Sequence, residues 1–303
     1  MASRYPLIVL LGVFLIGCRP ATPPPAAAPT VEVTATTALP TPGDQARSIR
    51  NAEYQLGIPN SLQVIELTNG SFEQGTPGVA DYISVQVTDF AASGDLDGDG
   101  SEETAALISE NYGGTGVFVF LAIYSNTGPA PEFLTSSIVD DQPQLNSLSI
   151  EDGEVFLDAT IHGPDEPVCC PTLRTTRHYR MVNNQLDMTD FTTFTPDGRP
   201  RTITIEAPAH SAEVFSTVQV RGSVTISPFE NNLTYSIKDV GGVELSRGAI
   251  NVDSAEPGAS GTFEAQIPIG NILSNAVVIL EVQDLSAEDG SLLAMDSVEL
   301  VVK

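Results

Sequence analysis

The sequence predicts a mainly β protein with a minor helical contribution, preceded by an export signal and a flexible tether. Val, Ile and Thr are frequent, and these residue types favour strands. Many short runs alternate apolar and polar residues, which is the period of a half-buried strand. Turn pairs such as Asn69-Gly70 and Asp152-Gly153 separate several of these runs. With 303 residues, the chain is long enough for two domains of ordinary size.

The charge balance is strongly acidic. The chain has 39 Asp and Glu residues against 13 Lys and Arg residues, which gives a formal net charge of −26. A general nucleic-acid binder needs clustered basic residues to neutralise phosphates, so the composition excludes that class of partner. An acidic surface suits a solvated extracellular protein and favours cations as ligands.

The first 18 residues read as an export signal. A single basic residue, Arg4, precedes an apolar run from Leu7 to Ile16. That run is too short to span a bilayer, but it has the length of a signal-peptide core. It ends in Leu-Ile-Gly-Cys18, which resembles the bacterial lipobox. The resemblance implies that Cys18 is lipidated and that the protein is extracytoplasmic and anchored to a bacterial membrane. The alternative is an ordinary secretion signal with a chance cysteine.

Residues 19–44 form the expected tether. They are rich in Pro, Ala and Thr, so they cannot bury a core and favour extended, polyproline-like conformations. At about 3 Å per residue, the segment reaches several tens of Å from the membrane.

The first folded domain is predicted over 45–193. It opens with a short helix at 44–56, whose stripe consists of Ala46, Ile49, Ala52, Tyr54 and Leu56. Strands are then expected at 62–67, 82–90, 104–111, 116–124, 145–150, 154–161, 174–182 and 185–191. The last two flank Asn183-Asn184 and predict a hairpin. We expect a single sheet, packed by the N-terminal helix.

A Pro- and Gly-containing linker at 194–202 leads to the second domain, predicted over 200–303. Its expected strands are 202–208, 216–226, 233–239, 243–252, 261–269, 276–285 and 295–303. Period-two alternation is clear at Val218, Val220, Val224 and Ile226. Seven short strands in about 100 residues are typical of a two-sheet sandwich.

Motifs within this second domain carry a resemblance to a known family. They are Val220 with Gly222, Phe229-Glu230, Asp239 to Gly242, Gly261 with Phe263, and Ser286 to Ser291. The stretch resembles the immunoglobulin-like domain of bacterial spore-germination proteins. The resemblance implies a sandwich with a non-catalytic interaction role, whose expected partner is an envelope protein or glycan.

The acidic stretch 95–103 has the spacing of a calcium loop. Oxygen-bearing residues stand at alternate positions: Asp95, Asp97, Asp99, Ser101 and Glu103. Gly100 permits the sharp turn, but Ala106 occupies the place of the closing EF-hand glutamate, so the loop is not an EF-hand. The pattern resembles the strand-flanked calcium loops of FG-GAP repeats. We expect one structural Ca²⁺, bound by the four carboxylates and the Ser101 carbonyl; the alternative is an acidic turn.

Cys169 and Cys170 are adjacent in the tract 162–180. Thiols in an oxidising exported compartment tend to pair, so a vicinal disulfide is expected. It predicts a rigid loop staple, with a redox switch as the alternative. A zinc site with His162 and His178 is disfavoured, because the spacings lie outside the usual range. The tract is similar to domains of unknown function in exported bacterial lipoproteins.

Two functions from different classes follow. The favoured one is a membrane-anchored binding or scaffold module that has no catalytic residues. The alternative is a cell-envelope hydrolase or thiol-redox enzyme that uses the 162–180 loop. The sequence contains no G-x-S-x-G motif, and the glycines at 111–116 lack the Lys-Ser/Thr of a phosphate loop. They predict a glycine-rich hairpin or bulge instead.

Overall fold

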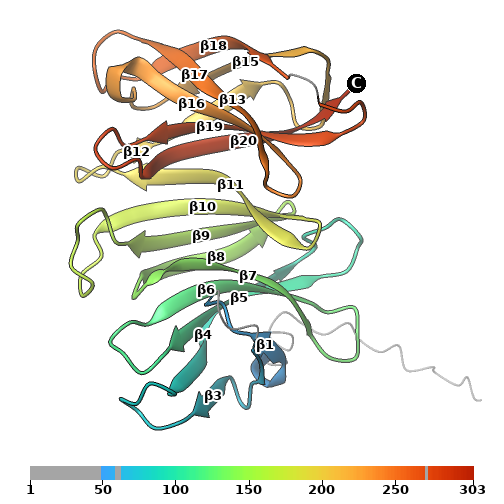
Figure 1. Cartoon of the computed structure of the whole chain (residues 1–303), viewed down its shortest axis with the longest axis vertical. Coiled ribbons are helices and arrows are strands. Elements are labelled where there is room, and N and C mark those ends of the chain that lie inside the picture. The colour runs from blue at the N-terminus through green and yellow to red at the C-terminus, as the bar shows by residue number, and fades with distance from the viewer. Residues whose placement is uncertain (1–48, 59–62, 270–271) are drawn as a thin grey trace, which may run out of the picture. The chain divides into compact units, whose positions relative to one another are not determined.

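A computed structural model describes residues 49–58, 63–269 and 272–303 (Figure 1). The apolar run at 7–16, the expected lipidation site Cys18 and the tether at 19–44 lie outside these residues. Within the described ranges, no helix combines the length and hydropathy needed to cross a membrane.

Strands make up nearly all of the described elements, so the prediction of a mainly β fold is confirmed. The first half contains the 3₁₀ turn η1 (Ile49–Asn51) and the strands β1 (Glu53–Gln55), β2 (Val64–Glu66), β3 (Ser71–Gln74), β4 (Ile83–Gly94), β5 (Glu103–Asn111), β6 (Phe118–Ser125), β7 (Glu132–Asp141), β8 (Gln144–Glu151), β9 (Glu154–Ile161), β10 (Leu173–Val182) and β11 (Gln185–Phe194).

The second half contains a shorter set of strands and a second 3₁₀ turn. They are β12 (Pro200–Arg201), β13 (Ile203–Ala207), β14 (Ala212–Val214), β15 (Thr217–Val224), η2 (Phe229–Asn231), β16 (Asn232–Asp239), β17 (Glu244–Ser254), β18 (Gly261–Pro268), β19 (Val277–Leu285) and β20 (Leu292–Val302).

The prediction of an N-terminal helix is wrong for the described residues 49–56. Residues 49–51 form only one 3₁₀ turn, and Tyr54 lies in strand β1. The physical reason is the spacing of Ala52, Tyr54 and Leu56, which are all buried while Glu53 is exposed. That spacing is the period of an extended chain, and the tertiary burial of Tyr54 outweighs the weaker helical pattern.

The expectation of a single sheet for 45–193 is also wrong. Strands β3 to β7 form one antiparallel sheet in chain order, and β8 to β11 belong to a different, larger sheet. One face of the β3–β7 sheet packs on β8 to β10 through residues such as Leu107, Leu121 and Leu157. The other face is covered by the 49–56 segment and β2. Strands β5 and β6 are therefore buried on both faces, which explains their continuous apolar runs.

The β10–β11 hairpin is confirmed. Asn183 and Asn184 both adopt positive φ, at 51° and 59°, as a two-residue hairpin turn requires. Strand β7 was not predicted, because its Thr and Ser residues interrupt the apolar alternation.

The second half forms a two-layer sandwich around one apolar core, which includes Val220, Ile237 and Leu280. Strands β13, β15 and β18 make one layer, while β16, β19 and β20 lie in the other. Strand β17 belongs to both layers: it pairs with β16 up to Asn251 and with β18 from Val252 onward.

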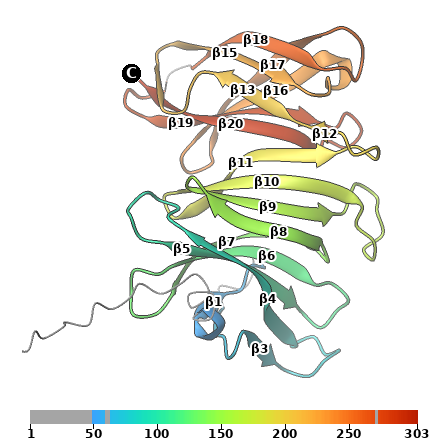
Figure 2. The ribbon, with the colours of Figure 1, turned by 180° about the vertical axis from the view of Figure 1, so that it is seen from behind.

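The expected linker at 194–202 is a tight turn. Thr195 donates its backbone N–H to the Arg199 carbonyl at 2.9 Å, and β12 then pairs with β11. Strand β11 also pairs with β20, so that β8 to β11 continue into the β20, β19 and β16 layer of the sandwich as one sheet (Figures 1 and 2). The domain limits at 193 and 200 stay a prediction.

Candidate functional site

The acidic loop connects β4 to β5, two neighbouring antiparallel strands. Gly94 and Glu103 are cross-strand partners, so the ladder closes directly at the base of the loop. Strand pairing thereby fixes both ends of an eight-residue excursion, 95–102. This placement agrees with the strand-flanked loop that the sequence indicates.

Backbone amides of the loop donate hydrogen bonds to its own aspartates. Asp95 accepts from the N–H groups of Gly98 at 2.7 Å and Gly100 at 3.0 Å. Asp99 accepts from Ser101 N–H at 2.7 Å. These contacts are the local turns that Asp side chains favour, and they hold the carboxylates toward the inside of the loop.

The two glycines of the loop adopt backbone conformations that L side chains avoid. Gly98 has φ of 78° and Gly100 has φ of 88°. A side chain at either position would be strained although the surrounding space is open. The D-G-D-G sequence is therefore required by the loop conformation itself.

Three of the predicted ligands converge. Oxygens of Asp95, Asp97 and Asp99 all lie within 4.8 Å of one another. Three carboxylates at this separation repel each other, and a hard cation with oxygen ligands relieves that repulsion. The donor set therefore fits Ca²⁺ in its chemistry.

Glu103 lies beside this group and is buried, with 2% of its surface exposed. Its carboxylate accepts a hydrogen bond from Leu96 N–H at 2.9 Å. Burial raises the pKa of Glu103 above its ordinary value, and the three aspartates add to the rise while the Leu96 bond opposes it. Its carboxylate is therefore shielded from water and lies close to the negative charges of the three aspartates. Glu103 does not belong to the group of three that the structure brings together.

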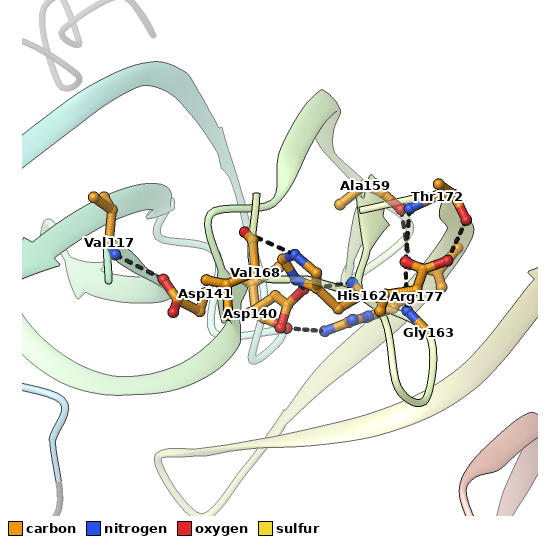
Figure 3. Close-up of polar contacts among 12 residues, drawn as sticks. Val117, Asp140, Asp141, Ala159, His162, Gly163, Val168, Thr172 and Arg177 are labelled. Atoms are coloured by element: carbon orange, nitrogen blue, oxygen red, sulfur yellow. Dashed lines mark hydrogen bonds and ion pairs between the residues drawn. The ribbon is translucent and has the colours of Figure 1, made fainter. Parts of the chain in front are cut away.

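The second candidate region is the loop between β9 and β10, which contains the paired cysteines. His162 lies at its start, and both ring nitrogens face acceptors (Figure 3). Nδ1 is 2.9 Å from a carboxylate oxygen of Asp140, and Nε2 is 3.0 Å from the Val168 carbonyl oxygen. Only the imidazolium form donates at both nitrogens. The hydrogen bond to Asp140 accordingly raises the pKa of His162.

Glu166 closes the same loop from the opposite side. Its carboxylate accepts from the backbone N–H groups of Gly163 and Thr172, both at 3.0 Å, and from the Thr172 hydroxyl. These bonds join the two ends of the loop, and the Thr172 hydroxyl is the leading cause of a lowered pKa at Glu166.

Within this loop, Cys169 and Cys170 are exposed, and their sulfurs are joined as a disulfide. The two histidines considered as zinc ligands make other contacts. His162 is held by Asp140 and Val168, and the His178 ring packs on Phe156 with 4.3 Å between ring centroids. Because both nitrogens of His162 face acceptors, the geometry gives this residue a loop-holding role and does not present it as a general base.

The glycine-rich stretch at 111–116 lies in the connection of the β5–β6 hairpin, which confirms the hairpin alternative of the prediction. The Asn111 side-chain amide donates to the carbonyls of Gly114 at 3.0 Å and Gly116 at 2.6 Å, and its oxygen accepts from Gly113 N–H. The side-chain amide of Asn111 therefore makes its hydrogen bonds within this connection.

Sequence reasoning missed a group of poorly solvated carboxyls where β11 meets β20. Asp190 and Asp296 are direct cross-strand partners. Acidic residues within two strands were the available signal, but the pairing of these distant strands could not be read from the sequence.

Comparison with known proteins locates a relationship in the second half of the chain. Residues 202–291 match the family model Gmad2, the immunoglobulin-like domain of bacterial spore germination. No curated protein matches the chain. The matched segment runs from the start of the sandwich to the β19–β20 turn, and its layers have the expected architecture. The C-terminal sandwich is therefore similar to the immunoglobulin-like domain of bacterial spore germination, as the sequence motifs indicated.

Proposed function

We propose that this protein is an extracytoplasmic lipoprotein that acts as a non-catalytic binding or scaffold module. Lipidated Cys18 anchors it to a bacterial membrane, and residues 19–44 hold the folded part away from the surface. The observation that carries the proposal is the match of 202–291 to an immunoglobulin-like family, which is not an enzyme family. The signal-like N-terminal sequence supports the location.

The acidic loop has a structural part in this proposal. Asp95, Asp97 and Asp99 would bind one Ca²⁺, with Glu103 and the Ser101 carbonyl completing the set. The bound ion would supply positive charge where the loop concentrates negative charge. The buried position of Glu103 supports the assignment, because a carboxylate shielded from water gains most from a nearby cation. The loop lies at the end of the β4–β5 hairpin, so its order stabilises a strand pair of the β3–β7 sheet.

The binding role is tested by crosslinking in native envelopes. The full-length protein is expressed at its natural location, crosslinked, and the crosslinked positions are mapped by mass spectrometry. We expect crosslinks to an envelope protein or glycan to concentrate on residues 200–303. Val220 lies in the sandwich core, so Val220→Asp serves as the disrupted control at equal abundance. Crosslinks that are equally frequent in this control, or that fall outside 200–303, contradict the proposal.

A further inference from the structure

The place where β11 pairs with β20 contains two acidic residues in direct opposition. We define the β11–β20 seam as the paired residues 190–192 and 294–296. Asp190 lies opposite Asp296, so their β-carbons are about 5 Å apart, as in any antiparallel pair. Like charges directly opposite each other destabilise a strand pair.

The same pairing links the strands on either side of the 195–199 turn. On one side are β8 to β11, and on the other is the sandwich strand β20. Side-chain contacts reinforce the junction: Thr193 Oγ1 donates to the Leu293 carbonyl at 2.7 Å, and Ser297 Oγ donates to the Thr189 carbonyl at 3.0 Å. The repelling pair therefore lies where the two halves of the chain are joined.

Both aspartates are partly buried. Burial raises the pKa of Asp190 to about 7, and the charges of Asp296 and Glu154 add to this rise. Burial also raises the pKa of Asp296 to about 6, although backbone N–H groups of Ile205 and Ser297 donate to its carboxylate and oppose the rise.

We propose that the β11–β20 seam is a pH-sensitive joint, which is closed when Asp190 and Asp296 share a proton and loosens when both carboxylates are ionised. This inference does not depend on lipidation, on calcium or on any binding partner.

Charged groups on neighbouring strands lie near this pair. On β9, Glu154 is held by Arg180 of β10 at 2.6 Å. Arg180 also contacts His210, with 3.1 Å between Nη1 and Nδ1. Next to the seam, Arg201 of β12 and Asp284 of β19 form a 2.7 Å ion pair, and Asp284 is the strand partner of Ala294. Since these cations are already paired with other groups, they leave the Asp190–Asp296 repulsion uncompensated.

Two further groups titrate beside the seam. Asp187, on β11, has a raised pKa because of burial, with Glu281 adding to the rise. His178 is the cross-strand partner of Asp190 on the β10 side, and burial lowers its pKa. Because its pKa is lowered, His178 stabilises the closed seam more as the pH rises. This effect is opposite to that of the two aspartates and reduces the net pH dependence of the seam.

The sign and the pH window follow from the raised pKa values. In an open seam both aspartates ionise near pH 4, as exposed carboxyls do. The closed seam therefore binds more protons than the open one between about pH 4 and 7. Its stabilisation is complete below this window, falls as the pH rises, and is lost above the pKa of about 7 at Asp190. One proton linked in this way changes the closed-to-open ratio by about tenfold per pH unit.

Hydrogen–deuterium exchange of the full-length protein tests the proposal. Protection of peptides covering 185–194 and 292–298 is measured at pH 5, 6 and 7.5, with exchange times corrected for intrinsic pH dependence. We expect wild-type protection to fall at least about tenfold from pH 5 to 7.5, while peptides covering 104–108 in β5 stay protected. Asp190→Asn mimics the protonated side chain and should give high protection at every pH.

A surface acid provides the matched control. Asp253 is exposed on β17, so Asp253→Asn should keep the wild-type pH dependence. If Asp190→Asn does not fold, Asp296→Asn is measured in its place, with the same expected loss of pH dependence. Wild-type protection that is constant across the pH range overturns the proposal. An aspartate variant with an unchanged wild-type slope overturns it as well.

Discussion

The phenol of Tyr54 donates a 2.5 Å hydrogen bond to the carboxylate of Glu110, which is completely buried in β5. The same carboxylate accepts from the Tyr112 hydroxyl and from Gly57 N–H at 2.8 Å. Three donors satisfy an anion that would otherwise be costly to bury. These bonds attach the 54–57 segment to the β3–β7 sheet.

We therefore expect Glu110→Ala to destabilise the fold by about 3 kcal/mol, because it leaves buried donors without an acceptor. Tyr54→Phe removes one hydrogen bond and should cost about 1–2 kcal/mol. Chemical denaturation followed by circular dichroism gives both values. The control is Tyr82→Phe, since Tyr82 bonds to Glu73 on the surface and its loss should cost less than about 0.5 kcal/mol. Equal effects for Tyr54→Phe and Tyr82→Phe would contradict this account.

Calcium should stabilise the protein through the acidic loop. At a calcium concentration ten times the dissociation constant, mass action gives about 1.4 kcal/mol, which corresponds to a rise in Tm of roughly 2–6 °C. Differential scanning calorimetry in millimolar calcium and in chelator measures the shift. Asp97→Ala should abolish it without removing the fold, because the remaining carboxylates then repel each other less.

The neighbouring Glu102 offers a matched control for that experiment. It is an exposed acid of the same loop that lies outside the proposed ligand set. Glu102→Gln should therefore keep the full calcium shift. If the wild-type protein melts at the same temperature in calcium and in chelator, the loop is only an acidic turn.

His162 should titrate at a higher pH than an ordinary histidine. Its folded pKa is raised by Asp140, so the stabilisation is fully present below the unfolded value near 6.5 and is lost as the pH rises through the folded pKa. NMR of the imidazole resonances in wild-type protein and in Asp140→Asn measures the difference. The variant should bring the pKa down. A pKa that is unchanged by Asp140→Asn would show that this carboxylate does not hold the ring.

The paired cysteines should not both be free thiols in the exported protein. Alkylation before and after reduction, followed by mass spectrometry, reports their state. We expect Cys169 and Cys170 to react only after reduction, since an oxidising compartment favours pairing. Two alkylated thiols without reductant would eliminate both the loop staple and the redox switch.

Cys18 should determine membrane attachment. Cys18→Ser removes the acceptor of the lipid, so the variant should accumulate as an unprocessed precursor or be released from the membrane. Detergent partitioning and immunoblotting distinguish these forms. Partitioning identical to that of the wild type would exclude lipidation at this residue as the anchor.

The sequence predicts most strands because burial on one face leaves a period-two pattern. Val218, Val220 and Val224 alternate with exposed residues in β15, and the structure buries all three. The 49–56 segment is an exception: Ala52, Tyr54 and Leu56 follow the same period of two, but the helical stripe that includes Ile49 predicts a helix there. Strand β7 was missed for a related reason: only one of its residues, Val139, is fully buried.

The candidate sites differ in predictability for the same reason. The acidic loop is contiguous, so residue order alone brings Asp95, Asp97 and Asp99 together. The β11–β20 seam depends on contacts such as that between Thr189 and Ser297, which lie 108 residues apart. No pattern within either strand specifies its partner, because register between distant strands is set by the assembled core.

The ladder between β11 and β20 also hides an otherwise open flank of the immunoglobulin-like sandwich. A fragment that begins at residue 202 would leave backbone N–H and C=O groups of 294–296 without their β11 partners. Unpaired strand flanks recruit other chains and lead to self-association. Strand β11 therefore covers the 294–296 flank of β20 and shields its backbone groups from pairing with another chain.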